Sequence, residues 1–150
     1  MASNDMFSDQ QREFLASRDS AAVITVGADG VPKPVRITLG FFEGVLTSSG
    51  TESRVRTKRF RQDPTCVLYF ARGRFQYLSV ESTVEIIDGA AGVELNQRLI
   101  AAMQGVDEGN AVDWFGETLE PDAFRQRLID DGRLVYRFHP TKVHGILRWG

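Results

Sequence analysis

The residues best suited to chemistry are five basic side chains that follow a group of hydroxyls. The basic residues are Arg54, Arg56, Lys58, Arg59 and Arg61, and the hydroxyls are Ser48, Ser49, Thr51 and Ser53. Guanidinium and ammonium groups donate charge-assisted hydrogen bonds to phosphate. Hydroxyl residues suit the start of a helix, where free backbone N–H groups also favour an anion. The spacing therefore predicts a binding site for a ligand that ends in phosphate.

A second interpretation of the same segment stays open, because a basic run on a short helix is also typical of a solvated face. The surroundings of the run favour phosphate binding. It follows a strand-like hairpin and ends at Asp63-Pro64, since the residue before proline is pushed out of helical geometry. Only Val55 and Phe60 are apolar within it, so packing alone gives little reason for the helix to form.

The overall charge limits the partners of the chain. Its 18 basic and 20 acidic residues give a formal net charge of -2 and a pI near 5.7, so any anion site must be local. A nucleic-acid site would have aromatic side chains between its charges, but residues 54–61 contain only Phe60. We expect neither a nucleic acid nor a membrane as partner. Residues 1–7 lack the apolar region of an export signal, which makes the cytoplasm the expected location.

Familiar catalytic motifs are absent from the sequence. It has no G-x-G-x-x-G, no G-x-x-x-x-G-K-[ST], no C-x-x-C, no H-E-x-x-H and no G-x-S-x-G. The two histidines, His139 and His144, argue against a metal site built on imidazole. Cys66 lies in an apolar run, which is typical of a buried, inert thiol. No catalytic side chain is identified, so any enzymatic chemistry would be carried by a bound cofactor.

The element pattern predicts one α+β domain over residues 1–150, long enough to bury about 70 % of its unfolded surface. A capping box at Ser8 starts a helix that ends near Arg18. Strands are expected at 21–27, 32–42, 45–48, 65–71, 75–87, 133–139 and 142–148, the last two separated by Pro140, and further helices at 54–62, 90–104 and 121–131. Six or seven antiparallel strands with outer helices favour a closed barrel, because closure removes exposed edges.

From residue 10 to the end, the chain resembles the pyridoxamine-phosphate-oxidase-like split β-barrel proteins, and within them the branch that uses the deazaflavin F420. The segments that carry the resemblance are Ala21-Ala-Val-Ile-Thr-Val26, Asp29-Gly-Val-Pro32, Thr47-Ser-Ser49, Arg54 to Pro64, Tyr77-Leu-Ser-Val-Glu81 and Arg137 to Gly145. The resemblance implies a six- to seven-stranded antiparallel split barrel with peripheral helices. It also implies a homodimer whose two cofactor clefts lie at the subunit interface.

The resemblance further implies which residues hold the cofactor, F420 or alternatively FMN. By position, the phosphate would be held by Arg54, Arg56, Thr57 and Lys58, the polyol by Ser48 and Ser49, and the ring edge by Arg36, Ile37 and Thr38, with Phe75 and Tyr77 lining the cleft. Lys33, Lys58 and Arg61 would favour the more anionic F420. Trp114 and Phe115, in the long connection 105–120, either cap a substrate cleft or simply pack this loop onto the barrel.

The family pattern is not matched everywhere. Arginine stands at position 56, where the branch often has lysine, and Arg59-Phe60 replaces Asn-Leu. Arginine keeps the charge and adds a two-pronged donor. Arg148-Trp149 does not reproduce the signature by which true pyridoxamine-phosphate oxidases grip their substrate. The expected function is an F420-dependent oxidoreductase that passes hydride to a conjugated or quinone-like molecule. An FMN-dependent oxidoreductase and a non-enzymatic flavin or F420 carrier are the alternatives.

Overall fold

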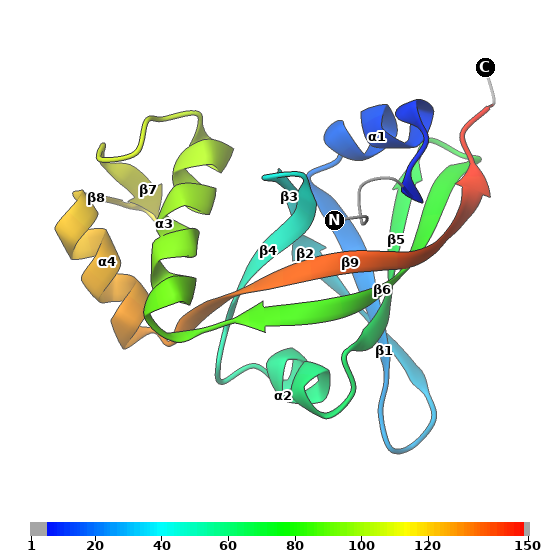
Figure 1. The fold of residues 1–150 in the computed structure, drawn as a ribbon, viewed down its shortest axis with the longest axis horizontal. Helices are drawn as coiled ribbons and strands as arrows, with labels where there is room; N and C mark the ends of the chain where they lie inside the picture. The colour runs from blue at the N-terminus through cyan, green and yellow to red at the C-terminus, as the bar shows by residue number, and fades with distance from the viewer. Residues whose placement is uncertain (1–5, 149–150) are drawn as a thin grey trace.

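The computed structural model describes residues 6–148, and its main feature is a curled antiparallel sheet of seven strands (Figure 1). The strands are β1 (Ser20–Val26), β2 (Pro32–Thr38), β3 (Gly40–Phe42), β4 (Val45–Thr51), β5 (Thr65–Arg72), β6 (Gln76–Ile87) and β9 (Arg133–Ile146). Their order across the sheet is β2-β1-β5-β6-β9-β4-β3. The predicted α+β split barrel with peripheral helices is confirmed.

The barrel closes where the chain crosses from one edge of the sheet to the other. The expected continuous strand over residues 32–42 is wrong, because the chain bends at Leu39 and β2 and β3 become the two opposite edge strands. The Leu39 N–H donates to the carbonyl of Asp19 over 3.1 Å, and the Ser48 hydroxyl donates to the carbonyl of Thr38 over 2.6 Å. The first bond continues the β1–β2 ladder, and the second joins β4 to the end of β2. Closure of this kind leaves fewer unpaired backbone groups at the sheet edges.

Pro140 does not divide the last strand, contrary to the expectation from sequence. β9 runs unbroken through it and pairs with both β4 and β6. The register shifts beside Glu81 and Ser82, where Thr141 becomes the extra residue of a β-bulge. A bulge can accommodate the proline, which has no N–H to donate to the neighbouring strand. The Thr141 hydroxyl bonds the carbonyl of Glu81 instead, over 3.1 Å.

Two short helices cover the barrel. α1 (Asp9–Ala16) begins with the predicted capping box at Ser8 and buries Phe14 and Leu15 in the barrel core. α2 (Val55–Gln62) follows β4 and lies on another side of the barrel from α1 (Figure 1). Within residues 6–148, every helix is too short or too polar to span a bilayer.

A separate group of elements connects the end of β6 to the start of β9. It contains α3 (Gly89–Gln104), a small hairpin of β7 (Val112–Trp114) and β8 (Glu117–Leu119), and α4 (Pro121–Asp130). These elements share an apolar cluster of their own, distinct from the barrel core. The connection 105–120 is thus partly structured.

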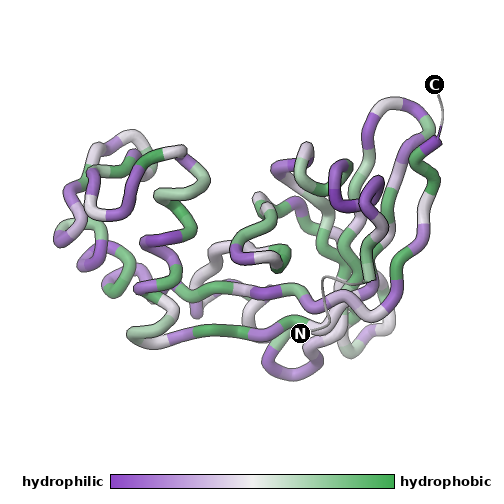
Figure 2. The backbone as a smooth tube through the Cα atoms, turned by 45° about the horizontal axis from the view of Figure 1, so that its top comes forward, coloured by the Kyte–Doolittle hydropathy of each residue, from purple (hydrophilic) through white to green (hydrophobic). Residues whose placement is uncertain are grey.

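Figure 2 shows hydrophobic and hydrophilic stretches alternating along the strands of the barrel, as a sheet buried on one face requires.

Candidate functional site

The basic helix α2 is fixed to the barrel by its two buried side chains, Phe60 and Thr57. Phe60 is 2 % exposed and meets Tyr136 and Phe138 edge-to-face, with ring centroids 5.1 and 6.2 Å apart. The remaining positions of this helix are mostly arginine, lysine and glutamine. Because burial uses only one narrow side of the helix, its arginines are left near the surface.

A buried hydrogen-bonded chain sets the start of α2. The Thr57 hydroxyl donates to the carbonyl of Thr51 over 2.6 Å and also bonds the hydroxyl of Tyr136. The single hydrogen of the Thr57 hydroxyl is used toward Thr51, so its oxygen accepts the hydrogen of the Tyr136 hydroxyl. The Arg56 guanidinium lies over the Tyr136 ring, 5.8 Å from its centroid. This network connects the centre of the barrel to the basic helix.

Three arginines line one cavity between α2 and the strands β1 and β2. This arginine cavity has a volume of about 240 Å3 and is lined by Val23, Thr25, Val35 and Val55 together with Arg54, Arg56 and Arg59. Within the described part of the chain, no carboxylate forms an ion pair with any of these arginines. The Nε atom of Arg56 is buried without a hydrogen-bond partner. Arg59 reaches the hydroxyl of Thr25 only at 3.4 Å.

The start of α2 adds backbone donors to this cavity's edge. Arg54 is the N-cap residue and its side chain caps nothing, so the N–H groups of the first turn have no partner within the helix. The expectation that hydroxyl residues begin the helix is wrong. Ser48, Ser49 and Thr51 belong to β4, and Ser53 bonds only weakly to the Thr51 hydroxyl, at 3.4 Å. A phosphate at this helix end would therefore meet free N–H groups.

Two cations that the sequence assigned to an anion are already neutralised. Arg61 donates to Glu52 over 2.6 and 3.0 Å and to Asp88 over 3.0 Å. Hydrogen bonds to these carboxylates raise the pKa of Arg61. Lys33 is bound to Asp29 over 2.6 Å. The expected contribution of Arg61 and Lys33 to an anionic ligand is corrected accordingly, since each already has a partner in the chain.

The predicted polyol residues Ser48 and Ser49 point to opposite faces of β4. Ser48 is 3 % exposed and its hydroxyl is used at the barrel closure. The Ser49 hydroxyl is buried and has no hydrogen-bond partner in the described structure. Buried hydroxyls without a partner are rare in proteins. Of the two serines, Ser49 is therefore the one whose hydroxyl is available to donate to and accept from a ligand.

The residues predicted along the ring edge lie on both faces of the edge strand β2. Ile37 is 4 % exposed and belongs to the barrel core. Side chains alternate along a strand, so Arg36 and Thr38 face away from the cavity that their neighbour Val35 lines. The Arg36 guanidinium reaches the Ser20 hydroxyl at 3.3 Å. Within one chain, these two side chains do not join the arginine cavity.

The last two predicted residues, Lys58 and Tyr77, lie apart from each other. Lys58 is exposed on α2, with its ammonium open to solvent or a ligand. Tyr77 lies near the start of β6, stacked on Tyr69 with centroids 5.7 Å apart, whereas the end of α2 meets β6 near Val84. An extended strand separates Tyr77 from Val84 by more than about 20 Å. One chain therefore does not bring Tyr77 to the arginines.

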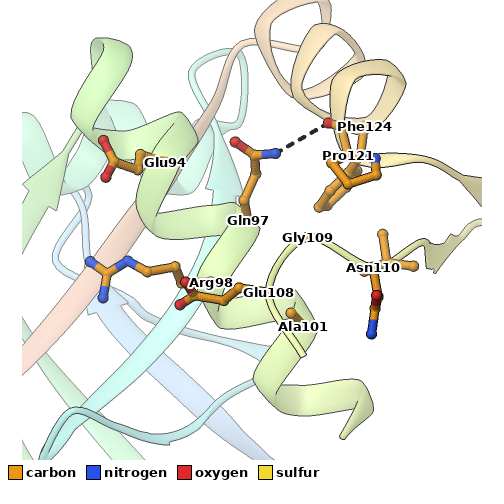
Figure 3. A pocket seen from close by; sticks show the side chains of 10 residues that line it. Glu94, Gln97, Arg98, Ala101, Glu108, Gly109, Asn110, Pro121 and Phe124 are labelled. Carbon is orange, nitrogen blue, oxygen red and sulfur yellow. Dashed lines mark hydrogen bonds between the residues drawn. The ribbon is translucent and has the colours of Figure 1, made fainter. Parts of the chain in front are cut away.

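A cavity between α3 and α4, a metal site and the thiol of Cys66 are weaker candidates. The cavity in Figure 3 lies between α3, α4 and residues 108–112, and there Gln97 reaches across to the carbonyl of Pro121 over 3.2 Å. Its volume is about 200 Å3, and Arg98, the arginine that lines it, is paired with Glu43. Residues 6–148 hold no group of three or more potential metal ligands. Burial raises the pKa of Cys66 to about 12, so this thiol is not a nucleophile. Trp149 lies outside the described residues.

Comparison with known proteins identifies the fold. No protein-family model and no curated protein matches the chain. An F420 reductase superposes with a TM-score of 0.61 at 19 % identity, over 88 % of this chain and 94 % of its own. A proposed pyridoxamine 5'-phosphate oxidase of Listeria innocua gives 0.62 at 13 %, over 89 % and 93 %. HutZ, a heme storage protein of Vibrio cholerae, gives 0.62 at 14 %, over 89 % and 90 %. These superpositions establish a shared split-barrel fold. At such low identities they do not establish a shared chemistry.

Proposed function

We propose that the chain is an F420-dependent oxidoreductase that holds its cofactor by the phosphate at the start of α2 and passes hydride to a conjugated or quinone-like small molecule. The observation that carries this proposal is the group of Arg54, Arg56 and Arg59 around one cavity without a carboxylate partner. A phosphate there would supply the missing acceptor. Each charged hydrogen bond to it contributes about 1.5 to 3 kcal/mol.

The residues present fit such a group. The unpartnered Nε of Arg56 and hydroxyl of Ser49 are the kind of buried polar atoms that a ligand satisfies. Reduced F420, when bound, supplies the hydride. The chain's own part is to orient the cofactor and the substrate and to keep water away from them. In this proposal, Arg54 and Arg56 hold the phosphate, the backbone of Thr57 adds an N–H, and Lys58 contacts the remaining negative charge.

A homodimer belongs to the same proposal. Arg36, Thr38 and Tyr77 lie away from the arginine cavity of their own chain, so they take part only if a second subunit brings its copies to the cleft. The exposed apolar side chains Val35 and Val55, 43 % and 62 % exposed, stand at the same cavity and offer surface for such a contact.

The choice of F420 over FMN rests on the family resemblance and on the free ammonium of Lys58, because Lys33 and Arg61 are paired within the chain. Fluorescence titration of the purified protein with each cofactor tests it. We expect the lower dissociation constant for F420, and a clear preference for FMN would contradict the F420 assignment. Reoxidation of bound, reduced cofactor by a panel of quinones then separates an enzyme from a carrier, which would bind the cofactor and reduce none of them.

A further inference from the structure

A second and larger cavity lies where α3, α4 and the start of β9 meet. Its volume is about 430 Å3, within the usual range for small-molecule sites. Val93, Leu128 and Leu134, all at most 5 % exposed, line it with apolar surface. Ile129 also lines it and is 49 % exposed. A hydrophobic molecule of one or two rings would bury its surface against these side chains.

Two carboxylates and two arginines line this cavity, and within residues 6–148 the arginines form no ion pair with the carboxylates. Glu52 and Asp88 lie at one side, and both are bound by the same cation, Arg61. Arg125 lines the cavity and donates only to the amide oxygen of Gln97, at 3.3 Å. Arg133 also lines it and forms no ion pair within residues 6–148. The cavity therefore has two arginines left to bind an anion.

Arg133 is the better placed of the two. Its guanidinium is held over the rings of Trp114 and Phe115, 4.9 and 5.7 Å from their centroids, and its Nε is buried without a partner. Burial and the nearby charge of Arg54 lower the pKa of Arg133, which Asp131 offsets only in part. A half-buried cation that is repelled by a second one is stabilised by an anion.

The aromatic support of Arg133 is built at a conformational cost. Phe115 has φ +48°, and with Gly116 at φ +86° it forms the tight turn between β7 and β8. A bulky residue in this left-handed region is uncommon and strained. The Phe115 side chain is 79 % exposed, so burial of its ring does not explain the turn. In this turn the Phe115 ring contacts both the Arg133 guanidinium and the ring of Trp114, the latter edge-to-face with centroids 4.9 Å apart.

We propose that this cavity binds a small organic anion with an apolar body and one carboxylate or sulfonate group. The body lies against Val93, Leu128 and Leu134, and the acidic group faces Arg133. This site goes beyond the proposed function, because its occupancy requires neither the cofactor nor hydride transfer. Charge complementarity selects an anion over a neutral molecule of equal size.

The test uses 8-anilinonaphthalene-1-sulfonate, whose fluorescence rises on binding to an apolar site, and its displacement by 1-naphthoate or the neutral 1-naphthamide. We expect one probe per chain, displaced by naphthoate at a concentration at least tenfold lower than by naphthamide. Equal displacement by the two compounds would overturn the role of charge.

A pair of variants at one exposed position locates the site. Ile129→Glu and Ile129→Lys remove the same apolar contact and place opposite charges at the cavity. We expect Ile129→Glu to weaken probe binding on the order of tenfold relative to Ile129→Lys. Met103→Glu, on the exposed part of α3 outside the cavity, is the control and leaves binding unchanged.

Several results would contradict the proposal. Equal binding by the two Ile129 variants would place the probe elsewhere, as would a loss on Met103→Glu. Probe binding that disappears as the protein self-associates would assign the cavity to a second copy of the chain. Arg133→Gln is expected to weaken binding at least tenfold, and if it does not fold, the Ile129 pair alone decides. Cofactor titration of the same variants keeps this site distinct from the arginines of α2, since Ile129 variants are expected to bind cofactor normally.

Discussion

At the scale of single residues, the hydrogen bonds between Tyr136, Thr57 and Thr51 predict that removing the Thr57 hydroxyl costs more stability than removing the Tyr136 hydroxyl. Thr57→Val leaves the buried Tyr136 hydroxyl without an acceptor and is expected to cost about 1 to 3 kcal/mol. Tyr136→Phe leaves Thr57 bonded to the Thr51 carbonyl, so only about 0.5 to 1.5 kcal/mol is expected. Urea unfolding measures both. A larger loss from Tyr136→Phe than from Thr57→Val would contradict the assigned direction of donation.

The buried thiol of Cys66 predicts a pH dependence of stability. Burial raises the pKa of this thiol from its usual 9.0 to about 12 in the folded chain. Between these values, the unfolded chain loses the thiol proton while the folded chain keeps it. The free energy of unfolding therefore decreases as pH rises from about 9 to about 12. Cys66→Ala is expected to show a shallower decrease in the same interval, measured by urea unfolding at each pH. Parallel curves for the two proteins would show that Cys66 does not contribute.

Sequence alone could predict Arg54 and Arg56 as candidate phosphate ligands, because charge-dense runs are visible without a structure. It could not separate them from Arg61, since the partners of Arg61 come from residue 52 and from residue 88. Arg133 carries no local signal either. Its surroundings are created by Trp114 and Phe115, which only the folded chain brings beside it.

At the scale of the elements, α3 approaches β6 so closely that only glycine fits between them. A Cβ at Gly92 would lie 2.4 Å from the carbonyl oxygen of Ile87. Alanine normally stabilises a helix relative to glycine by about 1 kcal/mol. Here Gly92→Ala is expected to destabilise the chain by about 1 to 3 kcal/mol through overpacking.

Gly40→Ala is the matched control for this prediction. A Cβ at Gly40 meets no atom within 4 Å, and its backbone does not need glycine. We expect this variant to be neutral or stabilising by about 0.4 to 1 kcal/mol. Thermal unfolding of both variants provides the comparison. Equal melting temperatures would refute the close packing of α3 against the sheet.

Most elements could be predicted from hydrophobic periodicity and helix punctuation, including α1, α3 and α4. The two wrong strand predictions, at Leu39 and at Pro140, have physical causes. The bend at Leu39 is a consequence of barrel closure, which depends on strands far apart in sequence. The bulge opposite Pro140 depends on pairing with β6. Local patterns show where strands form, whereas tertiary pairing decides where they are interrupted.

At the scale of the whole molecule, the proposed homodimer predicts a mass near twice 16.8 kDa. Val55 is 62 % exposed beside the arginine cavity, so a charge placed there would be buried in the contact. Val55→Asp is expected to shift the mass toward that of one chain, as measured by light scattering after gel filtration. Met103→Asp, on α3 and 46 % exposed, should leave the dimer intact. A monomeric wild-type protein would remove the shared cleft from the proposal.

The proposed function depends on Arg54 and Arg56 holding the phosphate of a redox cofactor. The direct measurement is cofactor retention: protein is incubated with F420 or FMN, desalted and examined by its absorption spectrum. The Arg54→Ala/Arg56→Ala variant is expected to bind about 10²- to 10⁴-fold more weakly and to lose the cofactor on desalting. Arg61→Gln, which removes one positive charge already paired with Glu52 and Asp88, is expected to retain it. Full retention by the double variant, with cooperative unfolding preserved, would contradict the claim.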